Sequence, residues 1–281
     1  MIEINAYAKI NLSLEVLGPR PDGYHEVRSV LQTVSLHDTL SFYPANSIST
    51  VADLPGWQAK KSLVLRAAEV LKKTTGTHQG ARIEVKKRIP LTAGLGGDSA
   101  NAAATFLGLN RLWQAGLTPE EITAIGSSLG SDIPFFIRGG TALASGRGEV
   151  ITPLSPTPKR YILLVMPDVP SLPSKTGQLY GLLQKTHFTN GGTTKRLVQA
   201  IKEGELPETL LLNTFENLAY HTFEGLELYR RHLLKMGAPN LHLAGSGPAL
   251  YALFTQEEPA ADLLKQCIDQ KLKAFMAETV N

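Results

Sequence analysis

Three glycines lie where a predicted strand runs into a predicted helix, in the segment PLTAGLGGDSANAAA that begins at Pro90. Gly94, Gly96 and Gly97 have no Cβ atom, so backbone N–H groups of this loop can approach a ligand closely. The first turn of the helix adds unpaired N–H groups and a partial positive charge. The loop therefore predicts a phosphate-binding site, unless its glycines serve only tight packing of strand on helix. It matches neither the P-loop pattern nor the spacing of a dinucleotide-binding fingerprint.

A carboxylate precedes an apolar run in GSDIPFFI, which begins at Gly130. A carboxylate set among apolar side chains gains basicity, as a general base requires, which makes Asp132 a candidate for that role. The alternative is structural, because Ser131 or Asp132 could cap a short helix with Pro134 in its first turn.

Lys9 and Asn11 point to the same side of the alternating strand AYAKINLSL. An ammonium group in mid-strand, near a buried carboxylate, could stabilise a developing alkoxide and the charge of a transferred phosphoryl group. On an edge strand the same lysine would simply face solvent.

The turn DGYH places the ring of Tyr24 beside the imidazole of His25. Such a pair can stack on a heterocyclic base and hydrogen-bond to it, although turn residues often only pack. A further glycine pair, in AGSGP from Ala244, lies between two predicted strands and again permits a close approach of the backbone. A plain hairpin turn would have the same sequence.

The hydrophobic pattern predicts two domains of the α+β class. Alternation predicts strands at 2–16, 27–36, 39–43 and 81–88, and helical spacing predicts helices at 61–73 and 99–113. Three prolines in TPLSPTPK mark a boundary, so we expect domains at 1–155 and 156–281. The second domain should hold strands at 161–166, 241–244 and 249–254 and helices near 177–185, 195–201, 226–236 and up to about 275. A regular βαβ rhythm is missing, which favours α+β.

The composition excludes several classes of protein. The 281 residues are 43% hydrophobic, which excludes a disordered chain. The formal net charge of only +3 excludes a protein dedicated to coating polyanions. The basic residues concentrate between 60 and 88, which suits an anionic ligand but also a solvated helix face. The single cysteine, Cys267, fits a reducing compartment, and no apolar run is long enough to span a bilayer. We therefore expect a cytoplasmic protein that binds neither nucleic acid nor membrane.

Taken in order, these segments resemble the motifs of the GHMP kinases over essentially the whole chain. AKINLSLEV is similar to the family's first motif, PLTAGLGGDSANAAA to its ATP-binding glycine loop, and LAGSGPALYALF to its third motif. DGYHE together with GSDIPFFI resembles the branch that acts on 4-diphosphocytidyl-2-C-methyl-D-erythritol. The resemblance implies a first domain like domain 2 of ribosomal protein S5 and a ferredoxin-like second domain. It also implies transfer of the γ-phosphate of ATP to the 2-hydroxyl of that small-molecule substrate.

The same resemblance assigns roles by position. It implies Lys9 and Asp132 as the catalytic pair, Asn11 near the hydroxyls of the substrate, and Tyr24, His25 and Tyr180 around the cytosine. It implies an ATP-binding loop that consists of Pro90, Leu91, Thr92, Ala93, Gly94, Leu95, Gly96, Gly97, Asp98, Ser99 and Ala100. We expect a monomer or a weak homodimer.

Three departures from the family pattern matter, of which the first, Tyr7 in place of a proline, alters only the entry of the strand. Asp98 replaces a glycine, and a carboxylate at a helix N-terminus would repel phosphates unless Mg²⁺ lies between them. Asp98 is therefore a candidate Mg²⁺ ligand. Ser62 stands where an asparagine often contacts the adenine in the family, so the resemblance does not imply that contact here.

Two alternatives stay open. A GHMP kinase for homoserine or mevalonate would share the glycine loop and the third motif, but it has no reason to carry Tyr24 and His25. A non-catalytic nucleotide-binding module could keep the fold, since fold does not fix function. The presence of both Lys9 and Asp132 argues against such a module.

Overall fold

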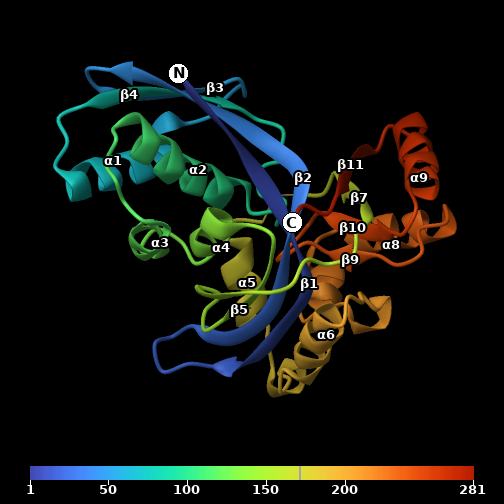
Figure 1. Ribbon diagram of the computed structural model, residues 1–281. Coiled ribbons are helices and arrows are strands. Elements are labelled where there is room, and N and C mark those ends of the chain that lie inside the picture. The colour runs from blue at the N-terminus through green and yellow to red at the C-terminus, as the bar shows by residue number, and fades with distance from the viewer. Residues whose placement is uncertain (171) are drawn as a thin grey trace. The chain divides into compact units, whose positions relative to one another are not determined.

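The structure, a computed structural model, describes residues 1–170 and 172–281 (Figure 1). Its helices and strands mix without a regular βαβ alternation, which confirms the α+β class. The chain forms two compact units, which are described separately. The first comprises Met1–Ala8, His37–Leu91 and Gly96–Gly139, and the second comprises Lys9–Leu36, Thr92–Leu95 and Gly140–Asn281. This division groups residues 9–36 with the second unit; the domain boundary at residue 155 stays a prediction.

The first unit packs helices against a sheet. Strand β4 (Gly80–Lys86) runs parallel to β3 (Ile48–Ala52) and antiparallel to the later part of β2 (His25–Ala45). Helices α1 (Leu63–Thr75) and α2 (Gly97–Leu112) lie side by side along this sheet (Figure 1). The unit also contains α3 (Pro119–Ser127), α4 (Ile133–Arg138) and a short 3₁₀ turn, Ala59–Lys61.

Small residues on α2 explain how closely it approaches the sheet. Its buried face is rich in alanine, and Gly108 meets the ring of Phe42 so closely that a Cβ atom there would lie 2.4 Å from a ring carbon. Helix α3 begins with a capping box in which Thr118 and Glu121 satisfy each other's backbone N–H groups. That box is a sequence signal for the helix, which the apolar pattern alone does not predict.

The second unit contains a four-stranded antiparallel sheet in the order β11–β7–β10–β9. These strands are β7 (Tyr161–Met166), β9 (His242–Leu243), β10 (Leu250–Phe254) and β11 (Lys273–Glu278). Its helices are α5 (Lys175–Gly181), α6 (Gly192–Lys202), α7 (Glu216–Thr222), α8 (Leu226–Lys235) and α9 (Glu257–Asp269), with 3₁₀ turns at Lys185–His187 and Glu208–Leu210.

A second set of strands in this unit includes most of β1 (Ile2–Pro19) and the first part of β2. Ser13 and Leu14 of β1 pair in parallel with β8 (Leu212–Asn213). Strand β2 pairs with β5 (Thr141–Ser145), which in turn pairs with β6 (Val150–Pro153).

Most of the predicted elements are confirmed, and two differ in an informative way. The strands expected at 27–36 and 39–43 are one continuous strand, β2. The last helix was expected to end near residue 275, which is wrong, because α9 ends at Asp269 and the chain turns through Lys271 at a φ of 60° into β11. The apolar residues after Leu272 pack as a strand against β7 instead.

A buried ion pair anchors the segment that leads into the glycine loop. The carboxylate of Asp38 on β2 pairs with the ammonium of Lys87, and both side chains are almost fully buried. Its Oδ1 atom also accepts hydrogen bonds from the N–H groups of Arg88 and Ile89, at 2.7 and 2.8 Å. A charged pair is tolerated in an interior when its remaining hydrogen-bonding capacity is satisfied in this way.

We predict that Asp38→Asn lowers the free energy of unfolding by about 3 to 5 kcal/mol, because it leaves the Lys87 ammonium buried without a counter-charge. Glu120→Gln is the matched control, since Glu120 pairs with Arg138 in an exposed position. Exposed pairs contribute less than about 1 kcal/mol. Urea unfolding of both variants measures the difference, and equal losses would contradict a structural role for the Asp38 pair.

Candidate active site

Lys9 lies on a part of β1 that is covered on both faces, and only 5% of it is exposed. The alternative of a solvent-facing lysine is therefore wrong. Its Nζ donates a hydrogen bond to Oδ1 of Asn11 at 2.7 Å, and Nδ2 of Asn11 donates to Oγ of Ser29 at 2.8 Å. Oγ of Ser29 donates in turn to the carbonyl of Ser13 at 2.6 Å. This chain of hydrogen bonds orients Asn11 so that its oxygen faces the ammonium.

The start of the glycine loop lies against the third motif within the second unit. A Cβ atom at Gly94, where φ is 87°, would lie 1.9 Å from the carbonyl oxygen of Ala244. The N–H of Ala249 donates to the carbonyl of Ala93 at 3.2 Å, and the N–H of Lys9 donates to the carbonyl of Leu95 at 3.0 Å. Gly94 is thus required for packing of the chain, and this contact brings the loop, the third motif and Lys9 together.

The rest of the glycine loop forms the beginning of α2 in the first unit. Gly96 occupies the N-cap position at a φ of 74° and supplies no side chain to cap the helix, whereas Ser62 caps α1 through the N–H of Leu65. In the part of the chain that the structure describes, no acceptor takes the N–H groups of residues 97–99. A helix start with unused donors fits a phosphate group.

Asp98 and Ser62 are two of the departures from the family pattern. Asp98 lies exposed in the first turn of α2. Among residues 1–170 and 172–281, no cluster of three His, Cys, Asp or Glu side chains could hold a metal ion. Mg²⁺ needs fewer protein ligands because it keeps water and phosphate oxygens, so one carboxylate fits the ion. Oγ of Ser62 is engaged in capping α1, and it also donates to the carbonyl of Ala59 at 2.8 Å.

Asp132 immediately precedes α4 in the first unit and is half-buried. Its backbone is helical and its side chain makes no capping hydrogen bond, so the structural alternative of a helix cap is wrong for Asp132. The following residues Ile133, Pro134 and Phe135 are buried, as the apolar run predicts. Lys9 belongs to the second unit, and its pairing with Asp132 stays a prediction.

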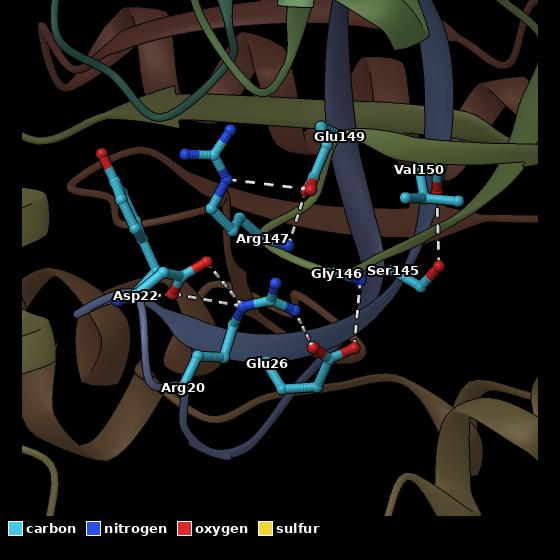
Figure 2. A network of polar contacts seen from close by, with 9 residues as sticks. Arg20, Asp22, Glu26, Ser145, Gly146, Arg147, Glu149 and Val150 are labelled. Carbon is cyan, nitrogen blue, oxygen red and sulfur yellow. Dashed lines mark hydrogen bonds and ion pairs between the residues drawn. The ribbon is translucent and has the colours of Figure 1, made fainter.

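The DGYH turn is held by a network of charged side chains in the second unit (Figure 2). Figure 2 shows the guanidinium of Arg20 between the carboxylates of Asp22 and Glu26, and the distance to Asp22 is 3.1 Å. The N–H of Tyr24 donates to Asp22 at 3.1 Å, and this bond lowers the pKa of the Asp22 carboxyl. The network therefore fixes the turn while 54% of Tyr24 stays exposed.

Arg147 is a residue that the sequence analysis missed. Its guanidinium lies 4.6 Å from the centre of the Tyr24 ring, a cation–π contact. Glu149 holds this segment, since its carboxylate accepts a hydrogen bond from the N–H of Arg147 at 2.6 Å. The only sequence signal is the pair of glycines around it, Gly146 and Gly148, which marks a tight turn after β5.

Aromatic rings gather around His25. The imidazole stacks on the ring of Tyr180, with centroids 4.9 Å apart and planes inclined by 27°. The ring of Phe188 lies 5.9 Å from His25, and Phe215 meets Tyr180 edge-on at 4.9 Å. The structure thus brings His25 and Tyr180 together, as the resemblance implies. A sandwich of Tyr24 and Tyr180 around a base stays a prediction.

Comparisons with known proteins support this assignment of motifs. Residues 62–140 match the model of the GHMP kinases N terminal domain. The chain is 41% identical over 280 residues to a 4-diphosphocytidyl-2-C-methyl-D-erythritol kinase of Dehalococcoides mccartyi, covering 100% of this chain and 99% of the relative. It is also 41% identical over 262 residues to the kinase of that name from Pelotomaculum thermopropionicum, covering 91% and 90%.

Solved structures agree with the sequence relatives. A crystal structure of 4-(cytidine 5'-diphospho)-2C-methyl-D-erythritol kinase superposes with a TM-score of 0.84 at 30% identity, over 100% of both chains. Homoserine kinase from Cytophaga hutchinsonii has a TM-score of 0.76 at 19% identity, covering 99% and 94%, and shares the fold alone. None of the described helices could cross a bilayer. The chain therefore belongs to the GHMP kinases, and within them to the 4-diphosphocytidyl-2-C-methyl-D-erythritol kinases.

Proposed function

We propose that the chain transfers the γ-phosphate of ATP to the 2-hydroxyl of 4-diphosphocytidyl-2-C-methyl-D-erythritol. Full-length similarity to kinases of that name supports the substrate, and the buried Lys9 ammonium beside the start of the glycine loop supports the chemistry. We also propose that the reaction takes place in the cytoplasm, that the enzyme is a monomer or weak homodimer, and that nucleic acid has no part in it.

Lys9 and Asp132 are the proposed catalytic pair. Phosphoryl transfer depends mostly on positioning and on electrostatic stabilisation of the transferred group. The ammonium of Lys9 stabilises negative charge on the reacting oxygens, and Asn11 keeps it in place. Asp132 takes the proton of the 2-hydroxyl, a role open to it because its carboxylate does not cap α4.

The nucleotide is bound at the start of α2. The uncapped N–H groups of residues 97–99 supply hydrogen-bond donors to its phosphates, and Asp98 provides a carboxylate ligand for Mg²⁺. The ion, when bound, neutralises charge on the phosphate oxygens.

The cytidine end of the substrate is recognised by aromatic residues. The exposed ring of Tyr24 offers a stacking surface, and Tyr180 lies beneath His25 and orients it. Stacking on a ring tolerates any base, whereas the imidazole nitrogens can match the hydrogen-bonding edge that separates cytosine from uracil.

The direct test is release of ADP by the purified wild-type protein. We expect turnover with 4-diphosphocytidyl-2-C-methyl-D-erythritol and none above background with homoserine or mevalonate.

In the same assay, Asp132→Asn should lower kcat by about a hundredfold or more with little change in the affinity for ATP, because only proton transfer is lost. Asp262→Asn on α9, an exposed carboxylate, is the control. A kcat for Asp132→Asn near that of the wild type would remove Asp132 from the mechanism.

We predict that Tyr24→Ala raises the KM for the cytidylylated substrate by about ten- to a hundredfold, because stacking on one ring contributes about 1 to 3 kcal/mol. The KM for ATP should hardly change. Since Tyr24 is largely exposed, its loss should leave the thermal midpoint of unfolding nearly unaltered. If Tyr24→Ala raised the KM for ATP instead, the assignment of Tyr24 to the cytidine end of the substrate would be wrong.

His25→Phe should separate stacking from recognition, because phenylalanine can stack on Tyr180 but has no ring nitrogens. We expect it to narrow the preference in kcat/KM for the cytidine over the uridine analogue. His25→Ala also removes the stacking and serves for comparison. Equal losses of kcat/KM on both analogues would reduce His25 to a residue that shapes the pocket.

Asp98→Gly should raise the Mg²⁺ concentration needed for half-maximal activity, since an anionic oxygen is lost from a hard-cation site. Glu120→Gln is the matched control, because Glu120 is an acidic residue in the first turn of another helix, α3. If the Mg²⁺ concentration for half-maximal activity is the same in the wild type, Asp98→Gly and Glu120→Gln, Asp98 acts only on the stability of α2.

A further inference from the structure

Lys175, the first residue of α5, connects three parts of the second unit. Its ammonium donates hydrogen bonds to the carbonyl of Thr92, at 2.5 Å, and to the carbonyl of Gly247. Next to it, the hydroxyl of Thr176 lies 2.8 Å from that of Ser246. The beginning of α5 therefore contacts both the start of the glycine loop and the third motif.

The ammonium of Lys175 is partly buried and has no anionic partner. Both of its acceptors are neutral carbonyl oxygens, and within the described residues no carboxylate pairs with it. A lysine ammonium has three N–H donors, and the two carbonyls use two of them. One charged donor therefore remains in a fixed direction.

The positive charge of Lys9 adds to the positive potential at Lys175. Burial, and next the positive charge of Lys9, lower the pKa of Lys175 to about 8. Lys9 is held nearby, since a Cβ atom at Gly245 in the third motif would lie 3.2 Å from its Nζ. Two ammonium groups close together repel each other, and a bound phosphate would relieve the repulsion.

Lys175 is also open to a ligand. Together with Thr92 and Pro248 it lines a cavity of about 900 Å³ in the second unit. The other charged or titratable residues that line this cavity are Asp168, Tyr229, Lys271 and Lys273.

We propose that Lys175 is a further phosphate-binding residue of this kinase, in which its remaining N–H, beside Lys9, binds a phosphate oxygen of a ligand at the start of the glycine loop. The proposal rests on the proposed function for the identity of the ligands. The phosphate is either the γ-phosphate of ATP or part of the diphosphate of the cytidylylated substrate. Both offer the same chemistry, a compact anion for a point charge.

The test is calorimetric titration of Lys175→Met and Lys175→Arg with three probes: a non-hydrolysable ATP analogue with Mg²⁺, ADP with Mg²⁺, and 4-diphosphocytidyl-2-C-methyl-D-erythritol. If Lys175 makes a charge-assisted hydrogen bond, Lys175→Met should lower the affinity for one ligand by about ten- to a hundredfold, and Lys175→Arg should recover part of that affinity. If Lys175→Met lowers the affinity for the ATP analogue but not for ADP, Lys175 binds the γ-phosphate. If it lowers the affinity for the cytidylylated substrate, Lys175 binds the diphosphate of that substrate. Lys265→Met, on the exposed side of α9, is the control.

The pH dependence of binding distinguishes a charge from a mere tether. Lys175 loses its proton as the pH rises through about 8, so the affinity of the wild type should fall between pH 7 and 9.5. Lys175→Arg should keep its affinity over this range, because a guanidinium stays charged. Lys175→Met should bind weakly at every pH.

The proposal is overturned if Lys175→Met, with the melting temperature of the wild type, binds all three probes as the wild type does. It is also overturned if the fall in affinity with pH persists in Lys175→Arg. Should Lys175→Met not fold, Lys175→Gln and the pH profiles of the wild type and Lys175→Arg decide the same question. If the wild type binds the ATP analogue but does not phosphorylate the cytidylylated substrate, the proposed function is wrong. The effect of the Lys175 substitutions on the affinity for the ATP analogue still tests the present proposal.

Discussion

The placement of a charged amine inside a strand that is covered on both faces constrains much of the second unit. Transfer of an ammonium group from water to such a place costs several kcal/mol unless polar groups receive it. Asn11 supplies one such group, and the amide can do so because Ser29 holds its other end. The hydroxyl of Tyr251 on β10 further donates to the carbonyl of Asn11 at 2.7 Å. The strand that carries Lys9 is thus attached to its neighbours through polar side chains as well as through the ladder.

The glycines of the loop have different structural roles. Gly94 is needed because the carbonyl of Ala244 occupies the space of a side chain, whereas a Cβ atom at Gly97 would lie 3.0 Å from the side chain of Ile89. Gly96 alone acts as the helix cap, and it leaves the donors of the first turn unused. Tight packing at Gly94 therefore does not exclude the proposed binding of a phosphate, which would use the N–H groups that Gly96 leaves uncapped.

The sequence predicted the elements that have a long regular pattern and the motifs within them, and it failed where contacts between distant segments decide. Alternation placed β1, but it could not reveal that both faces are covered, so Lys9 was compatible with solvent exposure. The helical pattern of α9 continued past Asp269, because Leu272, Phe275 and Met276 suit a helix as well as a strand until β7 pairs with them. Arg147 and Lys175 were missed because one lies in a short turn and the other acts through carbonyl groups, which leave no pattern in side-chain types.

The contact between Arg147 and Tyr24 raises the question of how a base could use the same ring. A cation–π contact at an exposed site contributes about 0.5 to 1 kcal/mol, whereas stacking of a base contributes about 1 to 3 kcal/mol. A base that displaces the guanidinium from the ring therefore still gains free energy. The backbone of the turn would not need to move, because the N–H of Tyr24 is held by Asp22, which pairs with Arg20, and neither contact involves Arg147. Because the turn is already fixed, a base that stacks on the exposed ring of Tyr24, as proposed, would lose little free energy in ordering it.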